Sequence, residues 1–440
     1  MIRQIVTLCW VMYVICSPLL GQASREPNKG QLQFVIYLSR HGVRSPTGKA
    51  AQYSVYSKGS WPIWDVPPGY LTKHGYHLME LFGAYDRLAL AQQGLVASSG
   101  CADAVNVTFY ADSDQRTRET GKALAAGMFP GCSVPVRALE EQANDPLFHP
   151  VKTKVDSSDS RLAFSALAGR IGNDPQNLTE AHRAQLSVLD KLLETCGTTR
   201  QDQKRVSLFE IPSTLSMGQG DHLVDIKGPL STAGTFTENF LLEYTEGMDT
   251  SSVGWGCVDG AAVRTLIDLH TASVDFAQRT PAIAKRQASN LLGQVHLSLN
   301  QAIIGKPIAG ALGKPMDKVL FLIGHDTNLT NIAGLLRINW IIDGRRDDTP
   351  PGGSLIFELW KTDGNKYSVR TYYTAQTLEQ MRNATELSLA APPPRIPIFI
   401  PDCSKNDFSC DWDDFSRTLL QLTGGISTAG KAGTAELDPR

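Results

Sequence analysis

Two arginines flank a single histidine at the point where a short apolar run of the chain ends. Gln33 to Leu38 is rich in β-branched and aromatic residues, which predicts a buried strand, and Arg40-His41-Gly42-Val43-Arg44 follows it. A guanidinium group offers a planar fork of donors that suits phosphate oxygens. Positive neighbours disfavour the protonated form of His41, and a neutral imidazole beside an anion site can attack phosphorus. These residues therefore point to phosphoryl chemistry, and a solvated basic loop is the alternative.

Two further predicted strands are followed by groups that suit the same chemistry. After the strand expected from Asn106 to Ala111 comes Asp114-Gln115-Arg116-Thr117-Arg118, in which we expect one of the two arginines to face the site. After the strand expected from Val319 to Ile323 come His325, which could donate to a phosphate oxygen, and Asp326, which could protonate a leaving alkoxide. Taken alone, such an arginine is as readily a surface ion-pair partner as a functional residue. A His-Asp pair at the start of a helix is more often a helix cap than a catalytic pair. Three strand ends that converge on one chemistry favour phosphoryl transfer.

The elements that position these groups follow one another in the order of an α/β fold. At least two of the buried strands lead through a polar loop into a helical stretch, and ligands of such folds sit beyond the carboxyl ends of parallel strands. From 151 to 255 the strand signal fades, so we predict a mainly helical insertion that forms a lid or side wall. The α/β domain would then be discontinuous, over residues 24–150 and 256–424, and the small polar residues of 425–440 would form a frayed tail.

Composition and the amino-terminal residues limit the class of protein. The 440 residues include 42 Lys and Arg against 44 Asp and Glu, a formal charge of −2, which argues against nucleic acid or a polybasic membrane contact as the partner. Arg3, an apolar run from Ile5 to Leu20 and the small residues before position 24 predict a signal peptide over 1–23. A retained or lipid anchor is the alternative, but the run is short and contains Ser17-Pro18. We expect an exported protein, periplasmic or extracellular, with no membrane anchor after cleavage.

Export makes the cysteines informative. Of the eight cysteines, Cys9 and Cys16 would leave with the signal peptide. An even number in an oxidising compartment predicts disulfides, although six cysteines allow about fifteen pairings. No Cys/His cluster has the spacing of a zinc site, so we expect no metal. The six that remain are Cys101, Cys132, Cys196, Cys257, Cys403 and Cys410.

The motifs resemble those of the histidine acid phosphatase family, in particular its bacterial periplasmic phytase and acid phosphatase branch. Arg40-His41-Gly42-x-Arg44-x-Pro-Thr and Gly-His325-Asp326-Thr-Asn carry the likeness, which runs from about Phe34 to Leu422. The resemblance implies a large α/β domain with a central, mainly parallel sheet of the phosphoglycerate-mutase-like type and a smaller helical domain inserted in it. It also implies an exported enzyme that hydrolyses small phosphate monoesters, phytate (myo-inositol hexakisphosphate) first among them, through a phosphohistidine and without a cofactor.

Carried onto this chain, the resemblance implies a role for each motif residue. His41 would be the nucleophile, and Asp326 the general acid that then helps to activate water. Because an acid must be protonated to act, activity should fall as the pH rises through the pKa of Asp326 in the complex. Thr47 and Glu238 would contact the substrate beyond the scissile phosphate. The phosphoryl oxygens would be bound by Arg40, Arg44, Arg116 and His325. The resemblance also implies the disulfides Cys101–Cys132 and Cys403–Cys410, which leaves Cys196 with Cys257.

Two departures bear on the substrate. Gly48 stands where phytases of this branch tend to carry a basic residue, with Lys49 next to it, and Gln287 stands at another such position, beside Lys285 and Arg286. Since phytate is highly phosphorylated, fewer fixed cations would weaken its binding, and a glucose-1-phosphatase-like or broad-specificity acid phosphatase is the alternative. A non-catalytic phosphate-binding protein is the alternative from another class, but a pure binder would not need the acid Asp326. We expect a monomer.

Overall fold

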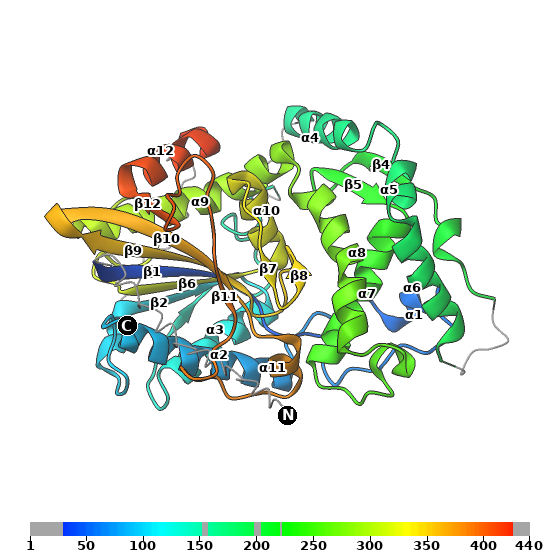
Figure 1. The fold of residues 1–440 in the computed structure, drawn as a ribbon, viewed down its shortest axis with the longest axis horizontal. Coiled ribbons are helices and arrows are strands. Elements are labelled where there is room, and N and C mark those ends of the chain that lie inside the picture. The colour runs from blue at the N-terminus through cyan, green and yellow to red at the C-terminus, as the bar shows by residue number, and fades with distance from the viewer. Residues whose placement is uncertain (1–29, 152–156, 198–203, 221, 426–440) are drawn as a thin grey trace, which may run out of the picture.

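The computed structural model describes residues 30–151, 157–197, 204–220 and 222–425. The predicted signal peptide at 1–23 lies outside these ranges, as does all but the first residue of the predicted tail at 425–440. The described chain forms one large mixed sheet with helices on both faces, beside a mainly helical region (Figure 1). Within these ranges no helix is long and apolar enough to cross a membrane.

The sheet combines a parallel half with an antiparallel half. Its strands are β1 (Gln31–Arg40), β2 (Val107–Ala111), β3 (Val136–Arg137), β6 (Val319–Gly324), β9 (Ser354–Thr362), β10 (Lys366–Thr374), β11 (Arg395–Pro397) and β12 (Ser409–Asp411). They lie in the order β11-β10-β9-β1-β6-β2-β3, with β12 also paired to β10. Strands β1, β6, β2 and β3 are parallel, whereas β9 to β12 pair antiparallel. The expected α/β class with mainly parallel central strands is therefore confirmed.

Helices cover both faces of the sheet because its central strands are apolar on both sides. The covering helices are α2 (Lys73–Gln92), α3 (Gln115–Met128), α9 (Pro281–Ile304), α10 (Asp326–Leu336) and α12 (Trp412–Thr423). From β1, Phe34, Ile36 and Leu38 pack into one core with α9, α10 and α12, and Val35 and Tyr37 pack into another with α2 and α3. The alternation follows from the two-residue repeat of a strand. Burial on both faces explains why the run after Gln33, from Phe34 to Leu38, is continuously apolar.

The helical region has a core of its own. It contains α1 (Ala50–Tyr53), α4 (Ser157–Arg170), α5 (Gln176–Ala181), α6 (Arg183–Thr195), α7 (Pro229–Thr245), α8 (Gly260–Gln278) and the hairpin β4 (Thr214–Met217) with β5 (Val224–Lys227). Helices α4, α5, α6 and α7 lie between residues 151 and 255, where the sequence predicts mainly helical structure. Val263, Leu266 and Ile267 of α8 share this core although they follow residue 255. The domain limits at 150 and 255 stay a prediction.

Short elements and three disulfides complete the part of the chain that the structure describes. The remaining elements are β7 (Ile341–Ile342), β8 (Arg345–Arg346), α11 (Leu378–Arg382) and the 3₁₀ segments η1 (Ala102–Asn106), η2 (Leu208–Glu210), η3 (Val253–Gly256) and η4 (Asp363–Asn365). The disulfides are Cys101–Cys132, Cys196–Cys257 and Cys403–Cys410. The second of them joins the end of α6 to the residue after η3, and so ties two parts of the helical region together.

Candidate active site

The three strand-end motifs meet at the carboxyl edge of the parallel strands. Strand β6 lies between β1 and β2, and Arg40 is in register with Gly324. At this edge the His41 backbone N–H donates to the Gly324 carbonyl at 3.0 Å, and the Asp112 N–H donates to the Ile323 carbonyl at 2.9 Å. The side chains that follow the three strands therefore start from neighbouring points, as the alignment of parallel strands requires.

His41 is a buried imidazole whose surroundings keep it uncharged. The residue is 2% exposed, and its Nδ1 lies 2.9 Å from the Gly42 carbonyl oxygen. We assign the proton to Nδ1, which donates to this carbonyl and leaves the lone pair of Nε2 free. Burial, and then the charges of Arg116, Arg40 and Arg44, hold the pKa of His41 well below its usual range. The ring therefore stays neutral in mild acid, which is the nucleophilic form.

Glu238 of α7 holds the two arginines of the loop after β1. Arg40 Nη2 lies 2.5 Å from Glu238 Oε1, and Arg44 Nη2 lies 3.2 Å from the same oxygen. Arg40 also donates through Nη1 to the Thr349 carbonyl at 2.6 Å. Burial opposes the charge on Glu238, but Arg44 and Arg40 outweigh it and lower the pKa of this carboxyl. The two guanidinium groups are thus fixed before any ligand binds, and a contact of Glu238 with substrate stays a prediction.

Three arginines of the site each have a buried N–H group that no described residue accepts from. The Nε atoms of Arg40, Arg44 and Arg116 are all buried, and none has a hydrogen-bond partner in the described part of the chain. Buried donors without partners are rare in proteins, and an anion bound among them would satisfy them. We call these three arginines, together with His41, the anion cradle.

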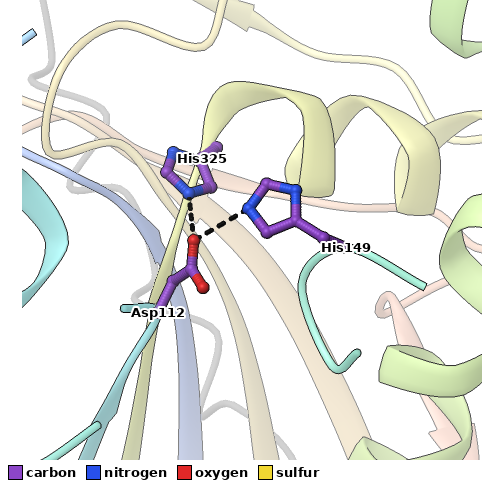
Figure 2. Close-up of side chains that lie close together, drawn as sticks. All are labelled: Asp112, His149 and His325. Atoms are coloured by element: carbon purple, nitrogen blue, oxygen red, sulfur yellow. Dashed lines mark hydrogen bonds and ion pairs between the residues drawn. The ribbon is translucent and has the colours of Figure 1, made fainter. Parts of the chain in front are cut away.

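His325 is hydrogen-bonded to the buried carboxylate of Asp112, a residue to which the sequence analysis gave no role. Figure 2 shows Asp112 between two imidazoles: Asp112 Oδ2 accepts from His325 Nε2 at 2.6 Å and from His149 Nε2 at 2.9 Å. Burial would raise the pKa of Asp112, but the hydrogen bonds from His149 and His325 outweigh it, so the pKa lies well below its usual range. Asp112 is therefore ionised and fixes the orientation of the His325 ring. His149 follows no predicted strand, so no sequence signal marked it.

Arg116 connects His325 to the anion cradle. From the first turn of α3, its Nη2 lies 3.3 Å from His325 Nδ1 and 2.6 Å from Asp114 Oδ2. Burial lowers the pKa of His325, with Arg116 acting in the same direction, and the hydrogen bond to Asp112 only partly offsets them. A guanidinium group only donates, so His325 Nδ1 accepts from Arg116, and the ring proton lies on Nε2, which donates to Asp112.

Asp326 faces the same space from the start of α10. Its Oδ2 lies 3.5 Å from Arg40 Nη2, and its Oδ1 accepts from the Thr327 N–H at 2.8 Å. His270 of α8 lies beside it, within 4.8 Å of the carboxylates of Asp326 and Glu238, and its buried Nε2 has no described partner. Burial would raise the pKa of Asp326, but Arg40 and then His270 hold it well below the usual range. Sequence reasoning missed His270, because a lone histidine inside a helix carries no motif.

Among the described residues, two groups of side chains bring together atoms that could hold a metal ion. One is Asp112, His149 and His325, and the other is Glu238, His270 and Asp326. In the first, both imidazole Nε2 atoms already donate to the carboxylate. In the second, the carboxylates contact guanidinium groups, which repel a cation. Neither group favours a metal ion over its present hydrogen bonds.

The outer positions of the predicted site differ in their surroundings. Thr47 is exposed and lies at the edge of the anion cradle, since a β-carbon on Gly69 would be 3.5 Å from Thr47 Cγ2 and 3.7 Å from Arg116 Nη1. Arg286 pairs with Asp159 of α4 at 2.8 Å. Lys285 Nζ comes within 3.8 Å of the β-carbon position of Gly424, after α12. The two basic side chains next to Gln287 in the sequence therefore lie beside α4 and the end of α12.

Known proteins with a similar sequence and fold are phosphatases. The family model described as Histidine phosphatase superfamily (branch 2) matches residues 31–374. The chain is 35% identical over 401 residues to Phytase AppA of Escherichia coli, covering 89% of this chain and 91% of the relative. It is 30% identical over 412 residues to a Glucose-1-phosphatase of Salmonella typhimurium, covering 90% and 94%. The solved Hafnia alvei phytase in complex with myo-inositol hexakis sulphate matches with a TM-score of 0.81 and 35% identity, covering 90% and 98%.

Proposed function

The chain belongs to branch 2 of the histidine phosphatase superfamily and is a phosphate monoester hydrolase, and from this premise we propose that it is an exported acid phosphatase acting through a phosphohistidine at His41. The observation that carries the proposal is the neutral, buried imidazole of His41 among three arginines whose buried Nε–H groups have no hydrogen-bond partner among the described residues. Donors that are fixed before the ligand binds can stabilise the charge of a transferring phosphoryl group without a metal ion.

In the first step, Nε2 of His41 attacks the phosphorus atom and the bond from phosphorus to the alcohol oxygen breaks. The electron pair of that bond stays on the oxygen, which takes a proton from Asp326 and leaves as the alcohol. The arginines of the anion cradle donate to the phosphoryl oxygens, over which the charge of the transition state is spread. The Nδ1–H of His41 keeps its hydrogen bond to Gly42 throughout, which holds the ring in place.

In the second step, water attacks the phosphorus atom of the phosphohistidine. The Asp326 carboxylate accepts a proton from this water, the bond from phosphorus to Nε2 breaks, and its electron pair returns to the imidazole. Inorganic phosphate leaves, and both side chains are back in their starting forms.

The charges around Asp326 predict how the rate depends on pH. In the free protein its pKa is well below the usual range, because Arg40 and His270 outweigh the effect of burial. A bound phosphate dianion offsets these positive charges, so the pKa of Asp326 rises in the complex and the acid form becomes accessible. The rate should fall as the pH rises through that pKa, while the low pKa of His41 keeps the nucleophile neutral in acid.

Phytate is the first candidate for the substrate, since the relatives include phytases of similar length. A glucose-1-phosphatase-like or broad activity is the second candidate, because another relative bears that name and Gly48 offers no side chain at the rim of the site. Initial rates in mild acid without added metal, on phytate, glucose 1-phosphate and an aryl phosphate, separate the two. Loss of turnover on all three in His41→Ala is expected, and near-full activity of that variant would overturn the mechanism.

Export is the second part of the proposal. The sequence pattern over 1–23 supports it, and the three disulfides suit an oxidising compartment. Sequencing of the amino terminus of protein recovered outside the cytoplasm should find the chain starting after Ala23. An uncleaved chain that stays in the cytoplasm would contradict it.

A further inference from the structure

A histidine that the proposed mechanism does not use lies next to His325. His149 belongs to the segment that follows β3, and its ring centroid lies 5.2 Å from that of His325, at an interplanar angle of 48°. The side chain of His149 is 20% exposed, whereas those of His325 and Asp112 are 6% and 0% exposed. Figure 2 shows both imidazoles pointing toward the same carboxylate. The two rings therefore meet at one buried negative charge.

Both rings donate to the same oxygen of Asp112. An ionised carboxylate only accepts hydrogen bonds, so the Nε2 atoms of His149 and His325, 2.9 and 2.6 Å from Asp112 Oδ2, each carry a proton. The other oxygen, Oδ1, is buried and has no hydrogen-bond partner among the described residues. A donor that only completed the hydrogen bonding of Asp112 would be expected at Oδ1. At Oδ2, His149 competes with His325 for the charge of one oxygen.

The place of His149 is fixed relative to the start of α10. The Phe148 carbonyl, next to it in the chain, accepts from the side-chain N–H of Asn328 at 2.9 Å. The side-chain oxygen of Asn328 in turn accepts from the backbone N–H of His325 at 2.8 Å. The backbone N–H of His149 donates to the Asp145 carbonyl at 2.8 Å, which closes a turn. Asn328 therefore joins the loop of His149 to the backbone of His325, so the two rings are held together before any ligand binds.

A bound phosphate changes the proton that His325 needs. In the free protein its proton is on Nε2, and Nδ1 accepts from Arg116 Nη2 at 3.3 Å. To donate to a phosphoryl oxygen, Nδ1 needs a proton of its own, because Nε2 stays bound to Asp112. The ring is then a cation between two anions, the Asp112 carboxylate and the phosphate. The carboxylate favours this second proton, and a second donor that draws on the charge of the carboxylate opposes it.

The electrostatic surroundings of His325 include His149 among the opposing groups. Burial lowers the pKa of His325, and its hydrogen bond to Asp112 offsets this only in part. Arg116 and then His149 lower it further. His149 itself faces Asp112, His325 and, in its own turn, Asp145. The charged and titratable groups that face His325 are Asp112, Asp114, Arg116, His149, His41 and Asp326.

We propose that His149 is a positioning residue of the reaction. Through the Asp112 oxygen that it shares with His325, it limits the second protonation of His325 and so confines donation from Nδ1 to a bound phosphate to acidic solution. Without a donor at position 149, the full charge of Asp112 would act on His325, which would then donate to phosphate up to a higher pH. The proposal rests on the proposed function and on the role at the phosphoryl oxygens that the sequence predicts for His325.

Titration of the His325 ring by nuclear magnetic resonance, in the free protein labelled at histidine and assigned with His325→Asn, tests the proposal. In His149→Phe, or in His149→Ala if the larger ring is not tolerated, the midpoint should rise by about one pH unit, the effect of one hydrogen bond to an ionised group. His149→Gln keeps an N–H donor and should stay close to wild type. His77→Phe, which removes an exposed histidine that pairs with Glu80 on α2, is the matched control and should not shift the midpoint.

Binding of inorganic phosphate, measured by calorimetry, gives a second readout. A higher midpoint keeps His325 doubly protonated to a higher pH. Phosphate should therefore bind His149→Phe about tenfold more tightly than wild type where the pH is above both midpoints, and equally well below them. In an Asp112→Asn background, His149→Phe should change neither readout, because the carboxylate through which it acts is gone.

The outcomes separate the two proposals. An unchanged midpoint in His149→Phe and His149→Ala would overturn the role of His149 and leave the phosphatase activity standing. A shift in His149→Gln as large as in His149→Phe, or a shift that persists in the Asp112→Asn background, would also overturn it. A wild-type protein that neither hydrolyses phosphate esters nor binds phosphate would refute the proposed function instead. In that case, the titration of the His325 ring still decides whether His149 acts on it through Asp112.

Discussion

Replacing Glu243 by Gln should make the protein more stable near neutral pH and change little in mild acid. Glu243 is 1% exposed, and its Oε2 accepts from the Gly254 N–H at 2.9 Å. Gly254 and Trp255 have φ values of 51° and 58°, so this bond holds a segment that includes a non-glycine residue in the left-handed region. A glutamine keeps the shape and the accepting oxygen, and removes only the charge that appears when Glu243 loses its proton.

The size of the effect follows from the pKa. Glutamate has an ordinary pKa of 4.5, and burial raises that of Glu243 to about 8 in the folded protein. A folded pKa above the unfolded one contributes stability that is complete below about pH 4.5 and is lost as the pH rises to about 8. Each pH unit in this window costs about 1.4 kcal/mol, and pH 7 lies about 2.5 units above the unfolded pKa. Wild type should therefore lose about 3 kcal/mol by pH 7 that Glu243→Gln keeps.

Urea unfolding of both proteins at about pH 4.5 and about pH 7.5, with the disulfides intact, measures the difference directly. Burial also raises the pKa of Glu246, to about 7, and this residue titrates in both proteins, so the prediction concerns the difference between them. Glu140→Gln, at an exposed position, serves as the matched control. If wild type and Glu243→Gln lost stability in parallel between the two pH values, the assignment of a neutral buried carboxyl would be refuted.

Three further substitutions test the site. Asp112→Asn should lower kcat/KM about 10- to 100-fold with an unchanged fold, because His325 loses the carboxylate that orients it; unchanged kinetics would contradict that role. Asp326→Asn should cost about 100-fold or more on an alkyl phosphate and much less on 4-nitrophenyl phosphate, whose leaving group needs no proton; equal losses would argue against an acid role. Gly48→Lys should impair turnover, because the new side chain collides with Tyr53. Gly48→Lys combined with Tyr53→Ala should instead raise kcat/KM for phytate about tenfold. No gain in the double variant would mean that this position does not limit phytate binding.

The parts of the fold that could be predicted are those with local signals. The strands β1, β2 and β6 are apolar runs that end in polar motifs, and the rule that parallel strands place such ends at one edge was sufficient to bring His41, Arg116 and His325 together. The hairpin of β4 and β5 gave no such signal, because its short strands are partly exposed and do not alternate clearly between buried and exposed residues.

The residues that escaped prediction act through packing between distant segments. His149 reaches Asp112 from a loop 37 residues away, and His270 reaches Asp326 from the middle of α8. A repeat pattern indicates which face of an element is buried, but not which neighbour it meets.

The central claim is that the phosphoryl group passes through His41, and trapping the intermediate tests it most directly. The enzyme would be mixed with a ³²P-labelled phosphate monoester in mild acid, quenched within milliseconds in alkali, digested and mapped by mass spectrometry. The account predicts label on His41 that survives alkali and is lost in acid, and no label in His41→Ala. Turnover without any labelled histidine, or equal labelling of His41→Ala, would contradict it.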